Sequence, residues 1–194
     1  MANKIKYGLK NVYFAVATIA ADGSATYAAP KAFPGAVSLS LEPQGESNPF
    51  FADNIEYWAG ISNAGYEGDL EIARIVDDFK TDVLGYKTGG NGLVYEDTNA
   101  TAKNFALLFQ FEGDEHATRH VFYNCTATRP NVSGQTRSDT VEPQTETITI
   151  SAASIYVSAL DTNVSKAEVD NVTATAAVYS AFYSAVTLPT AAST

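Results

Sequence analysis

The sequence predicts a mainly β protein with two packed antiparallel sheets, forming a sandwich or an open barrel, and a short flanking α-helix. Two observations support this fold class. Turn residues such as Asp22 and Gly23 separate short apolar runs, as they do in β-hairpins. The runs also alternate with period two, which is typical of half-buried strands. In "GAVSLSLEP" this alternation places two sets of side chains on opposite faces: Val37, Leu39 and Leu41 against Ser38, Ser40 and Glu42.

A second hairpin is predicted around Gly113 and Asp114. The segment "KNFALLFQF" precedes this turn and "ATRHVFYNC" follows it, and both alternate with period two. His116 and His120 have the spacing of two ligands on a zinc-binding helix. On a strand, however, residues four apart lie about 13 Å from each other, too far to share one ion. We therefore expect no metal site, and we expect Cys125 to be a buried thiol.

Two short helices are expected. Residues 77–84, "DDFKTDVL", begin with acidic residues and are followed by Gly85, a common helix terminator. The segment "TAAVYSAFYSAV" predicts a second short helix that ends before Pro189. "SKAE" at residues 165–168 fits a helix capping box, but the β-branched residues after it are poor helix formers. We expect residues 1–153 to form the β domain and 154–194 a C-terminal segment packed on it.

Composition excludes several classes of function. The chain has 194 residues, and its 22 acidic and 12 basic residues give a net charge of −10. This charge disfavours binding to nucleic acid, whose phosphates require a cationic surface. No nucleophile motif, phosphate-binding loop or metal-ligand pattern occurs, so we expect neither an enzyme nor a cofactor. We interpret the apolar run near the N-terminus as a strand, because Tyr and Thr interrupt it, and we expect no membrane span.

One strand carries a row of acidic residues. In "YEGDLEI", Glu67, Asp69 and Glu71 share one face. Glu42 and Glu56 lie on the strands around "PQGESNP" and extend the row in this interpretation. The row fits a solvated outer face and a surface selected to be anionic equally well. "PQGESNP" itself, with two prolines and a glycine, predicts a projecting flexible loop.

An alternative function is binding of a host surface or a carbohydrate. Tyr57, Trp58 and Tyr66 are aromatic residues that could form a platform for a sugar ring. Strand aromatics more often fill cores or interfaces. Glycan binding by a stable monomer would favour this alternative, and self-assembly would contradict it.

Several strings occur together and in order: "PGAVSLSLEPQGESNPFFADNIEYW", "GYEGDLEIARIVDDFKTDVLG", "KNFALLFQFEGD", "ATRHVFYNCTATRP" and "EPQTETITISA". Together they resemble the major tail protein of long-tailed, non-contractile phages of the phi13 type. "AAVYSAFYSAVTLP" is similar to the C-terminal segment of that family, whereas residues 154–173 match least well. The resemblance implies two packed sheets with a helix alongside, and subunits that form six-membered rings stacked into a tube for DNA.

The resemblance also implies partners and contact surfaces. These partners are other copies of the chain and the tail terminator, tape-measure and distal tail proteins, in a virion tail assembled in the host bacterial cytoplasm. DNA would pass through without specific binding, and a tail-like particle without a capsid is equally compatible. Candidates for contact with the next ring are the loop residues Pro43, Gln44, Gly45, Glu46, Ser47, Asn48 and Pro49 and the N-terminal arm residues Lys4, Lys6 and Lys10. Candidates for the lumen wall are Glu42, Glu56, Glu67, Asp69 and Glu71.

Overall fold

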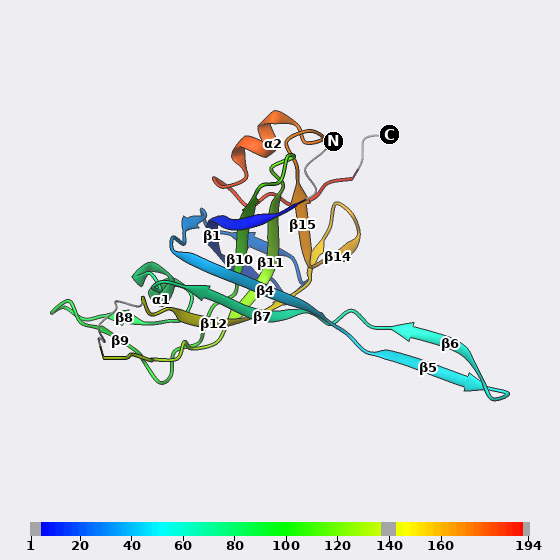
Figure 1. Ribbon diagram of the computed structural model, residues 1–194, viewed down its shortest axis with the longest axis horizontal. Helices are drawn as coiled ribbons and strands as arrows, with labels where there is room; N and C mark the ends of the chain where they lie inside the picture. Colours follow the sequence, from blue (N-terminus) through cyan, green and yellow to red (C-terminus); the bar gives the residue numbers. More distant parts are fainter. Residues whose placement is uncertain (1–4, 137–142, 192–194) are drawn as a thin grey trace.

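The computed structural model describes residues 5–136 and 143–191, and its main feature is a nine-stranded antiparallel sheet (Figure 1). Along its main path the order is β2 (Ala25–Tyr27), β1 (Tyr7–Ile19), β10 (Phe105–Glu112), β11 (Arg119–Ala127), β12 (Glu146–Ala153), β7 (Gly65–Ile72) and β4 (Ala36–Gln44). Two further strands, β3 (Lys31–Ala32) and β15 (Lys166–Val169), pair with β1 and β11. The predicted mainly β class is confirmed.

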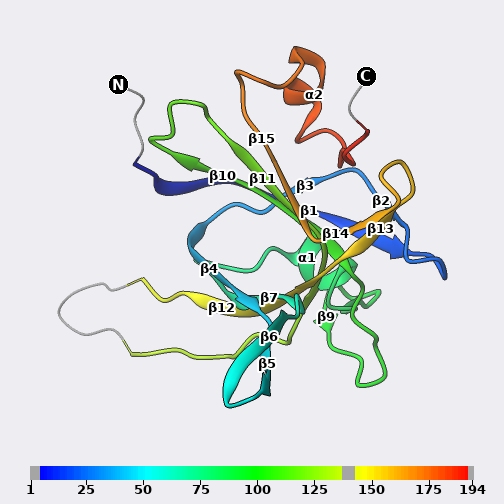
Figure 2. The same ribbon diagram turned by 90° about the vertical axis from the view of Figure 1, so that its right-hand side faces the viewer.

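Strand β11 divides the sheet into two layers. Its first half, from Arg119 to Phe122, pairs with β15, whereas its second half, from Asn124 to Ala127, pairs with β12. The sheet therefore changes partner along one strand and bends over itself (Figure 2). The two layers expected from the sequence are present, and they belong to one continuous hydrogen-bonded sheet.

The main core lies between these layers. Strand β7 contributes Leu70 and Ile72, and helix α1 (Asp77–Asp82) contributes Phe79, all fully buried. The ring of Phe79 stacks on Phe33 at 4.6 Å between centroids and meets Phe14 and Phe105 edge-on. Figure 2 shows α1 lying between the two layers. The acidic start and apolar centre of "DDFKTDVL" thus form the predicted helix, which closes one end of the core.

Strand β10 is buried on both faces. Phe105, Leu107 and Phe109 point into the main core, while Ala106 and Leu108 join a second apolar cluster. The C-terminal segment covers this second cluster with β13 (Ile155–Val157), β14 (Thr162–Val164) and α2 (Ala176–Ala181). The "FALLFQ" run is therefore apolar at successive positions because each of its faces contacts a different layer.

Other local expectations have mixed outcomes. The hairpins at Gly23 and Gly113 are confirmed by the pairing of β1 with β2 and of β10 with β11. The C-terminal helix exists but spans only Ala176–Ala181. The capping box at "SKAE" does not begin a helix. Its last three residues lie in strand β15, which forms backbone hydrogen bonds with the edge of β11. A register shift between Ala36 and Ser38 turns Val37 outward, so Val37 is exposed while Leu39 and Leu41 pack on the core.

The prediction that "PQGESNP" forms a projecting flexible loop is wrong. Pro43 and Gln44 complete β4, and the chain continues into β5 (Ser47–Ala52), which pairs with β6 (Ile55–Ile61) as a separate hairpin. Proline is tolerated at position 43 because β4 is the last strand of the sheet and needs no donor on its outer side. We call β5 and β6 the arm, and Figure 1 shows it projecting from the body. A second small hairpin, formed by β8 (Lys87–Thr88) and β9 (Val94–Tyr95), lies between α1 and β10 in the chain.

Candidate functional site

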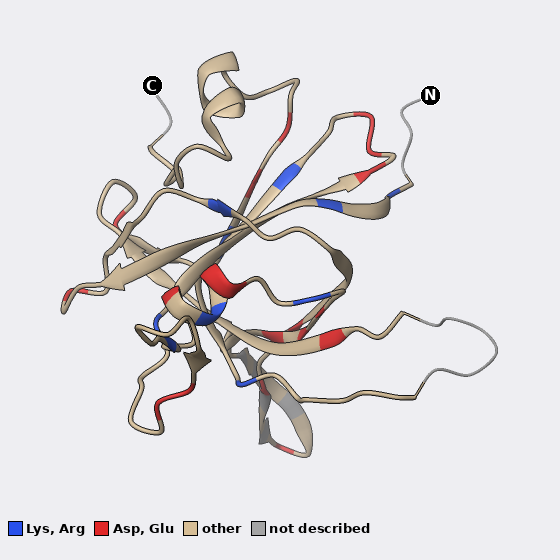
Figure 3. Ribbon diagram, turned by 90° about the vertical axis from the view of Figure 1, so that its left-hand side faces the viewer, with Lys and Arg blue, Asp and Glu red and all other residues tan. Residues whose placement is uncertain are grey.

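Strand β7 presents a row of carboxylates on the side of the sheet that faces away from the core. Glu67 and Asp69 are exposed and Glu71 is half-buried, while Leu70 and Ile72 on the opposite face are fully buried. The alternation predicted for "YEGDLEI" is therefore confirmed. Since β7 lies between β4 and β12, the row runs along the middle of this layer. Figure 3 shows where the acidic and basic positions lie along the described backbone.

The neighbouring strands extend this row across the sheet. Glu42 on β4 lies directly opposite Glu67, a pair of like charges. We call Glu42, Glu67, Asp69 and Glu71 the acidic face. Like charges in directly opposed positions destabilise a sheet, so folding alone gives no reason for this pair.

Hydroxyl groups border the acidic face. Thr149 donates a hydrogen bond of 2.8 Å to Asp69, and Ser38 and Thr145 donate bonds of 2.9 and 2.7 Å to Glu71. The bonds from Thr145 and Ser38 lower the pKa of Glu71, so its charge persists in mildly acidic solution. Sequence reasoning missed the contribution of β12. The alternation of Thr and Ile in "TETITIS" would have revealed it.

Glu56 does not join the acidic face. It lies on β6, at the register position of Phe51 in the arm, and its backbone belongs to a different sheet from β7. The expectation that Glu42 and Glu56 together extend the row fails for Glu56, because the strand before "PQGESNP" stays in the body while the hairpin after it leaves. The side chain of Glu56 lies outside the described part of the structure.

The arm carries large apolar side chains that stay mostly exposed in the described part of the subunit. Phe50, Tyr57 and Trp58 are 59%, 71% and 61% exposed. Backbone hydrogen bonds from Ala64 to Gln44 and from Ser62 to Glu46 continue the ladder of β4 and β7 into the arm. A two-stranded hairpin is marginally stable in water, and exposed aromatic groups of this kind mark interaction surfaces. Its exposed aromatic side chains make the arm a candidate surface for contact with another molecule.

The three aromatic residues considered as a sugar platform are separated. Tyr57 and Trp58 are consecutive on a strand, so their side chains leave opposite faces of the arm. Tyr66 lies in the body, where its ring meets Phe122 edge-on at 5.1 Å. No face of the subunit therefore presents all three of these rings together.

The N-terminal lysines occupy different positions. Lys6 precedes β1, and its Nζ lies 4.9 Å from the centre of the Phe111 ring. Lys10 lies within β1 and forms an ion pair with Glu112 at 3.6 Å. It therefore belongs to the sheet and not to the N-terminal arm that the resemblance implied. Lys4 lies outside the described residues.

The histidines and the cysteine occupy hairpin positions. His116 is exposed in the turn, and its backbone N–H donates to Asp114. His120 stacks on Phe109, and its Nδ1 lies 3.5 Å from Glu168. Burial lowers the pKa of His120, and burial raises the pKa of Cys125 to about 12. Within residues 5–136 and 143–191, no group of three His, Cys, Asp or Glu side chains is placed to hold a metal ion.

An open β fold, an acidic outer face and an exposed aromatic arm suit a protein that assembles with copies of itself. A family model described as phage tail tube protein matches residues 2–193, almost the whole chain. The chain belongs to the phage tail tube protein family. A comparison with curated proteins gives no match.

Membership of this family confirms the resemblance to a phage tail tube protein and makes the chain a structural subunit of such a tube. Such a subunit belongs to the virion tail and assembles with itself and with other tail components. The family is structural, in agreement with the expectation of a non-enzyme. In the part of the chain that the structure describes, no helix has the length and apolar character needed to span a membrane.

Proposed function

We propose that six copies of this chain form a ring, that stacked rings form the tail tube, and that the acidic face lines its lumen and conducts DNA during ejection. The observation that carries the proposal is the like-charged pair of Glu42 and Glu67 on the outer face of the sheet. This pair costs stability in the isolated subunit, so a role outside folding explains it better.

The sheet edge supports ring formation. Strand β4 is the last strand of the main path and has no partner on its outer side within the described residues. An open edge of this kind can continue the sheet into a neighbouring subunit. The contact joins different surfaces of the two copies, and such heterologous contacts close into rings or extend as filaments.

The net charge of the chain supports an anionic lumen wall. Six copies at −10 each give a ring of about −60. DNA carries a dense negative charge, so an anionic wall repels it and prevents adhesion during passage. Border hydroxyls fix the carboxylates of Asp69 and Glu71 in place. DNA therefore passes without a specific binding site.

The remaining components follow from this role. We propose that the tube is assembled in the host bacterial cytoplasm, that a tape-measure protein sets its length, and that terminator and distal tail proteins close its two ends. The residues Pro43 to Pro49, at the junction between β4 and the arm, and Lys6 and Lys10 remain our candidates for contacts between rings. A tail-like particle without a capsid would use the same surfaces.

Negative-stain electron microscopy and sedimentation velocity of the concentrated protein test assembly first. Hollow tubes or six-fold rings are expected. If only monomers persist with tail-initiator proteins present, the tube proposal is wrong, and glycan binding by those monomers would identify a binding module instead.

Substitution of the acidic face tests the lumen. The triple variant Glu42→Gln, Glu67→Gln, Asp69→Asn keeps Glu71 with its two hydrogen bonds and should form normal tubes. We expect slower DNA ejection from phages that carry it. A matched variant, Asp22→Asn, Asp78→Asn, Asp161→Asn, removes the same number of charges at exposed positions elsewhere and should eject DNA at the original rate. Equal ejection rates for both variants across moderate salt concentrations would show that the acidic face does not line the lumen.

A further inference from the structure

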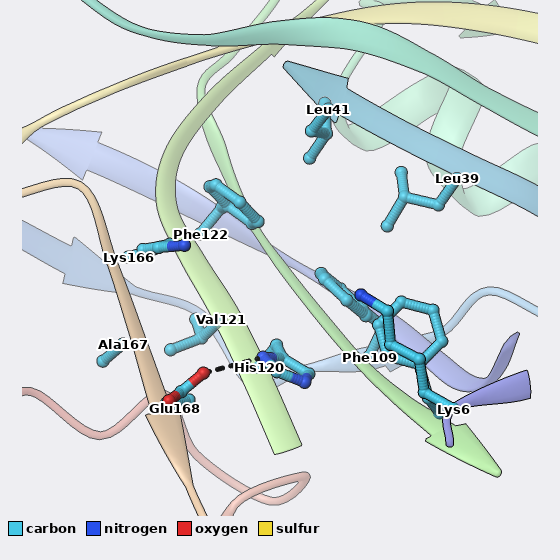
Figure 4. A pocket seen from close by; sticks show the side chains of 11 residues that line it. Lys6, Leu39, Leu41, Phe109, His120, Val121, Phe122, Lys166, Ala167 and Glu168 are labelled. Carbon is cyan, nitrogen blue, oxygen red and sulfur yellow. Dashed lines mark ion pairs between the residues drawn. The ribbon is translucent and has the colours of Figure 1, made fainter. Parts of the chain in front are cut away.

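A groove with apolar walls and a charged rim opens between the two layers of the sheet, beside strand β4. Leu39 and Leu41 form one wall, and Phe109, Phe111 and Phe122 form the other, with a cavity volume of about 300 Å³. Figure 4 shows the two leucines pointing from β4 across the gap toward Phe109 and Phe122. This volume is at the lower limit for small-molecule sites, so it suits one large side chain.

Cationic side chains stand at the rim of this groove. The Nζ atom of Lys6 lies 4.9 Å from the centre of the Phe111 ring, and that of Lys166 lies 5.1 Å from the centre of the Tyr66 ring. Burial lowers the pKa of His120, and both lysines lower it further, while Glu168, which also lines the groove, raises it. The rim thus carries two cations and one carboxylate, so its net charge is positive. An apolar floor with a positive rim favours an aromatic ring that carries a carboxylate nearby.

The arm offers such a ring. Trp58 is the one tryptophan of the chain, and a Cβ built on Gly60 would lie 2.2 Å from its indole. The indole therefore lies over Gly60, on the same face of β6, and only glycine leaves room for it. Phe50 is the register partner of Trp58 on β5, and Asp53 supplies a negative charge at the tip. Tryptophan is enriched among the residues that dominate interface energies.

The arm cannot deliver this ring to the groove of its own subunit. The bonds from Ala64 to Gln44 and from Ser62 to Glu46 keep the arm aligned with β4 and β7, and Figure 1 shows it leading away from the body. A projecting element and a distant complementary groove on the same chain define a heterologous contact.

We propose that the arm of one subunit inserts Trp58 into the groove between β4 and β10–β11 of a neighbouring subunit, with Asp53 near the cationic rim formed by Lys6 and Lys166. This inference rests on the proposed tube and names the receptor site for the arm within it. It also explains why Phe50 and Trp58 are exposed in the single subunit while the groove remains open.

The fluorescence of Trp58 tests the contact without any substitution. In the monomer the indole is 61% exposed, so it should emit at long wavelength and be quenched readily by acrylamide. In assembled tubes we expect emission at shorter wavelength and a marked loss of quenching. Equal quenching in tubes and monomers would overturn the proposed docking.

A nitroxide label identifies the receptor site. Cys125 is fully buried, so a label introduced by Glu168→Cys reacts alone and leaves both rim lysines in place. In tubes that mix labelled Trp58→Phe, Glu168→Cys subunits with unlabelled wild-type subunits, we expect the label to quench Trp58. A label at Val172→Cys, an exposed position near the C-terminal helix, is the matched control and should quench Trp58 much less.

Substitutions in the arm measure the contribution of this contact. Trp58→Ala should raise the protein concentration needed for assembly about 30-fold, as expected for a dominant interface residue. Tyr57→Ala, on the opposite face of β6, should raise it much less. If wild-type tubes form and the two labels quench alike, the docking inference is wrong while the tube proposal stands. If wild-type protein forms no tubes even with tail-initiator proteins, both are wrong.

Discussion

The guanidinium carbon of Arg119 lies 3.7 Å from the centre of the Tyr179 ring, which attaches the C-terminal helix to the sheet. The ring of Tyr183 lies on the same cation at 4.8 Å, and Nη1 of Arg119 donates a hydrogen bond to the Tyr179 carbonyl. Among the described residues, Nε of Arg119 is buried without a hydrogen-bond partner. The cation is thus stabilised by two aromatic rings, and the same contacts hold α2 on strand β11.

Replacing Arg119 should loosen the C-terminal segment. Arg119→Met keeps much of the aliphatic stem but removes the cation, so we expect a loss of about 1–2 kcal/mol in the free energy of unfolding. Hydrogen exchange should become faster in residues 176–186. Arg129→Met is the control, because Arg129 is exposed and pairs only with Glu96 in the contacts described; it should change stability by less than about 0.5 kcal/mol. Unchanged exchange in α2 would contradict this role.

The Phe79 side chain should be the most costly of the α1 residues to truncate. It is fully buried and contacts Phe14, Phe33 and Phe105. Phe79→Ala leaves a cavity between the two layers, and we expect a loss of about 3–5 kcal/mol, measured by urea unfolding. Val132→Ala, at a fully exposed position, should have almost no effect. A small loss for Phe79→Ala would show that the layers can collapse around the cavity.

Removing one charge from the opposed pair of Glu42 and Glu67 should stabilise the monomer. Glu67→Gln keeps the size of the side chain and removes the repulsion, so the urea midpoint should rise. The gain should shrink at 1 M salt, where the Debye length is about 3 Å. Asp69→Asn is a useful comparison, since it weakens the hydrogen bond from Thr149 and should give no gain. A rise of equal size at low and high salt would rule out an electrostatic cause.

Acid should weaken the β10–β11 hairpin through His120. Burial lowers the pKa of His120 below 6.5, and the opposing attraction of Glu168 is weak because that carboxylate is largely exposed. The unfolded chain therefore takes up a proton before the folded chain does. Stability from this group is complete above pH 6.5 and declines as the pH falls from 6.5 toward the lower folded value.

Two variants isolate this pH dependence in urea unfolding experiments. His120→Phe keeps a ring against Phe109 but cannot take up a proton, so its stability should decline less below pH 6.5 than that of the wild type. His116→Asn, in the exposed turn of the same hairpin, should keep the wild-type dependence. An identical decline in the wild type and in His120→Phe would assign the effect to other groups.

Local sequence was sufficient to predict the elements that depend on near neighbours. The hairpins at Gly23 and Gly113, the helix that begins at Asp77 and the outward face of Glu67, Asp69 and Glu71 all follow from turn residues and periodicity. These features depend on the direction of successive side chains, which the backbone fixes within a few residues. The distinctive strings along the chain likewise indicated the tail tube family, and the family match covers residues 2–193.

Tertiary structure decided which strands lie beside one another. Alternation states which side chains share a face, but it does not name the strand across from them. The opposition of Glu42 to Glu67, the burial of β10 on both faces and the change of partner along β11 therefore came from long-range pairing. "PQGESNP" has the composition of a loop, yet residues of β6 and β7 pair along it and make it the base of the arm. Hydrogen bonds to distant residues outweighed its local preference for a turn.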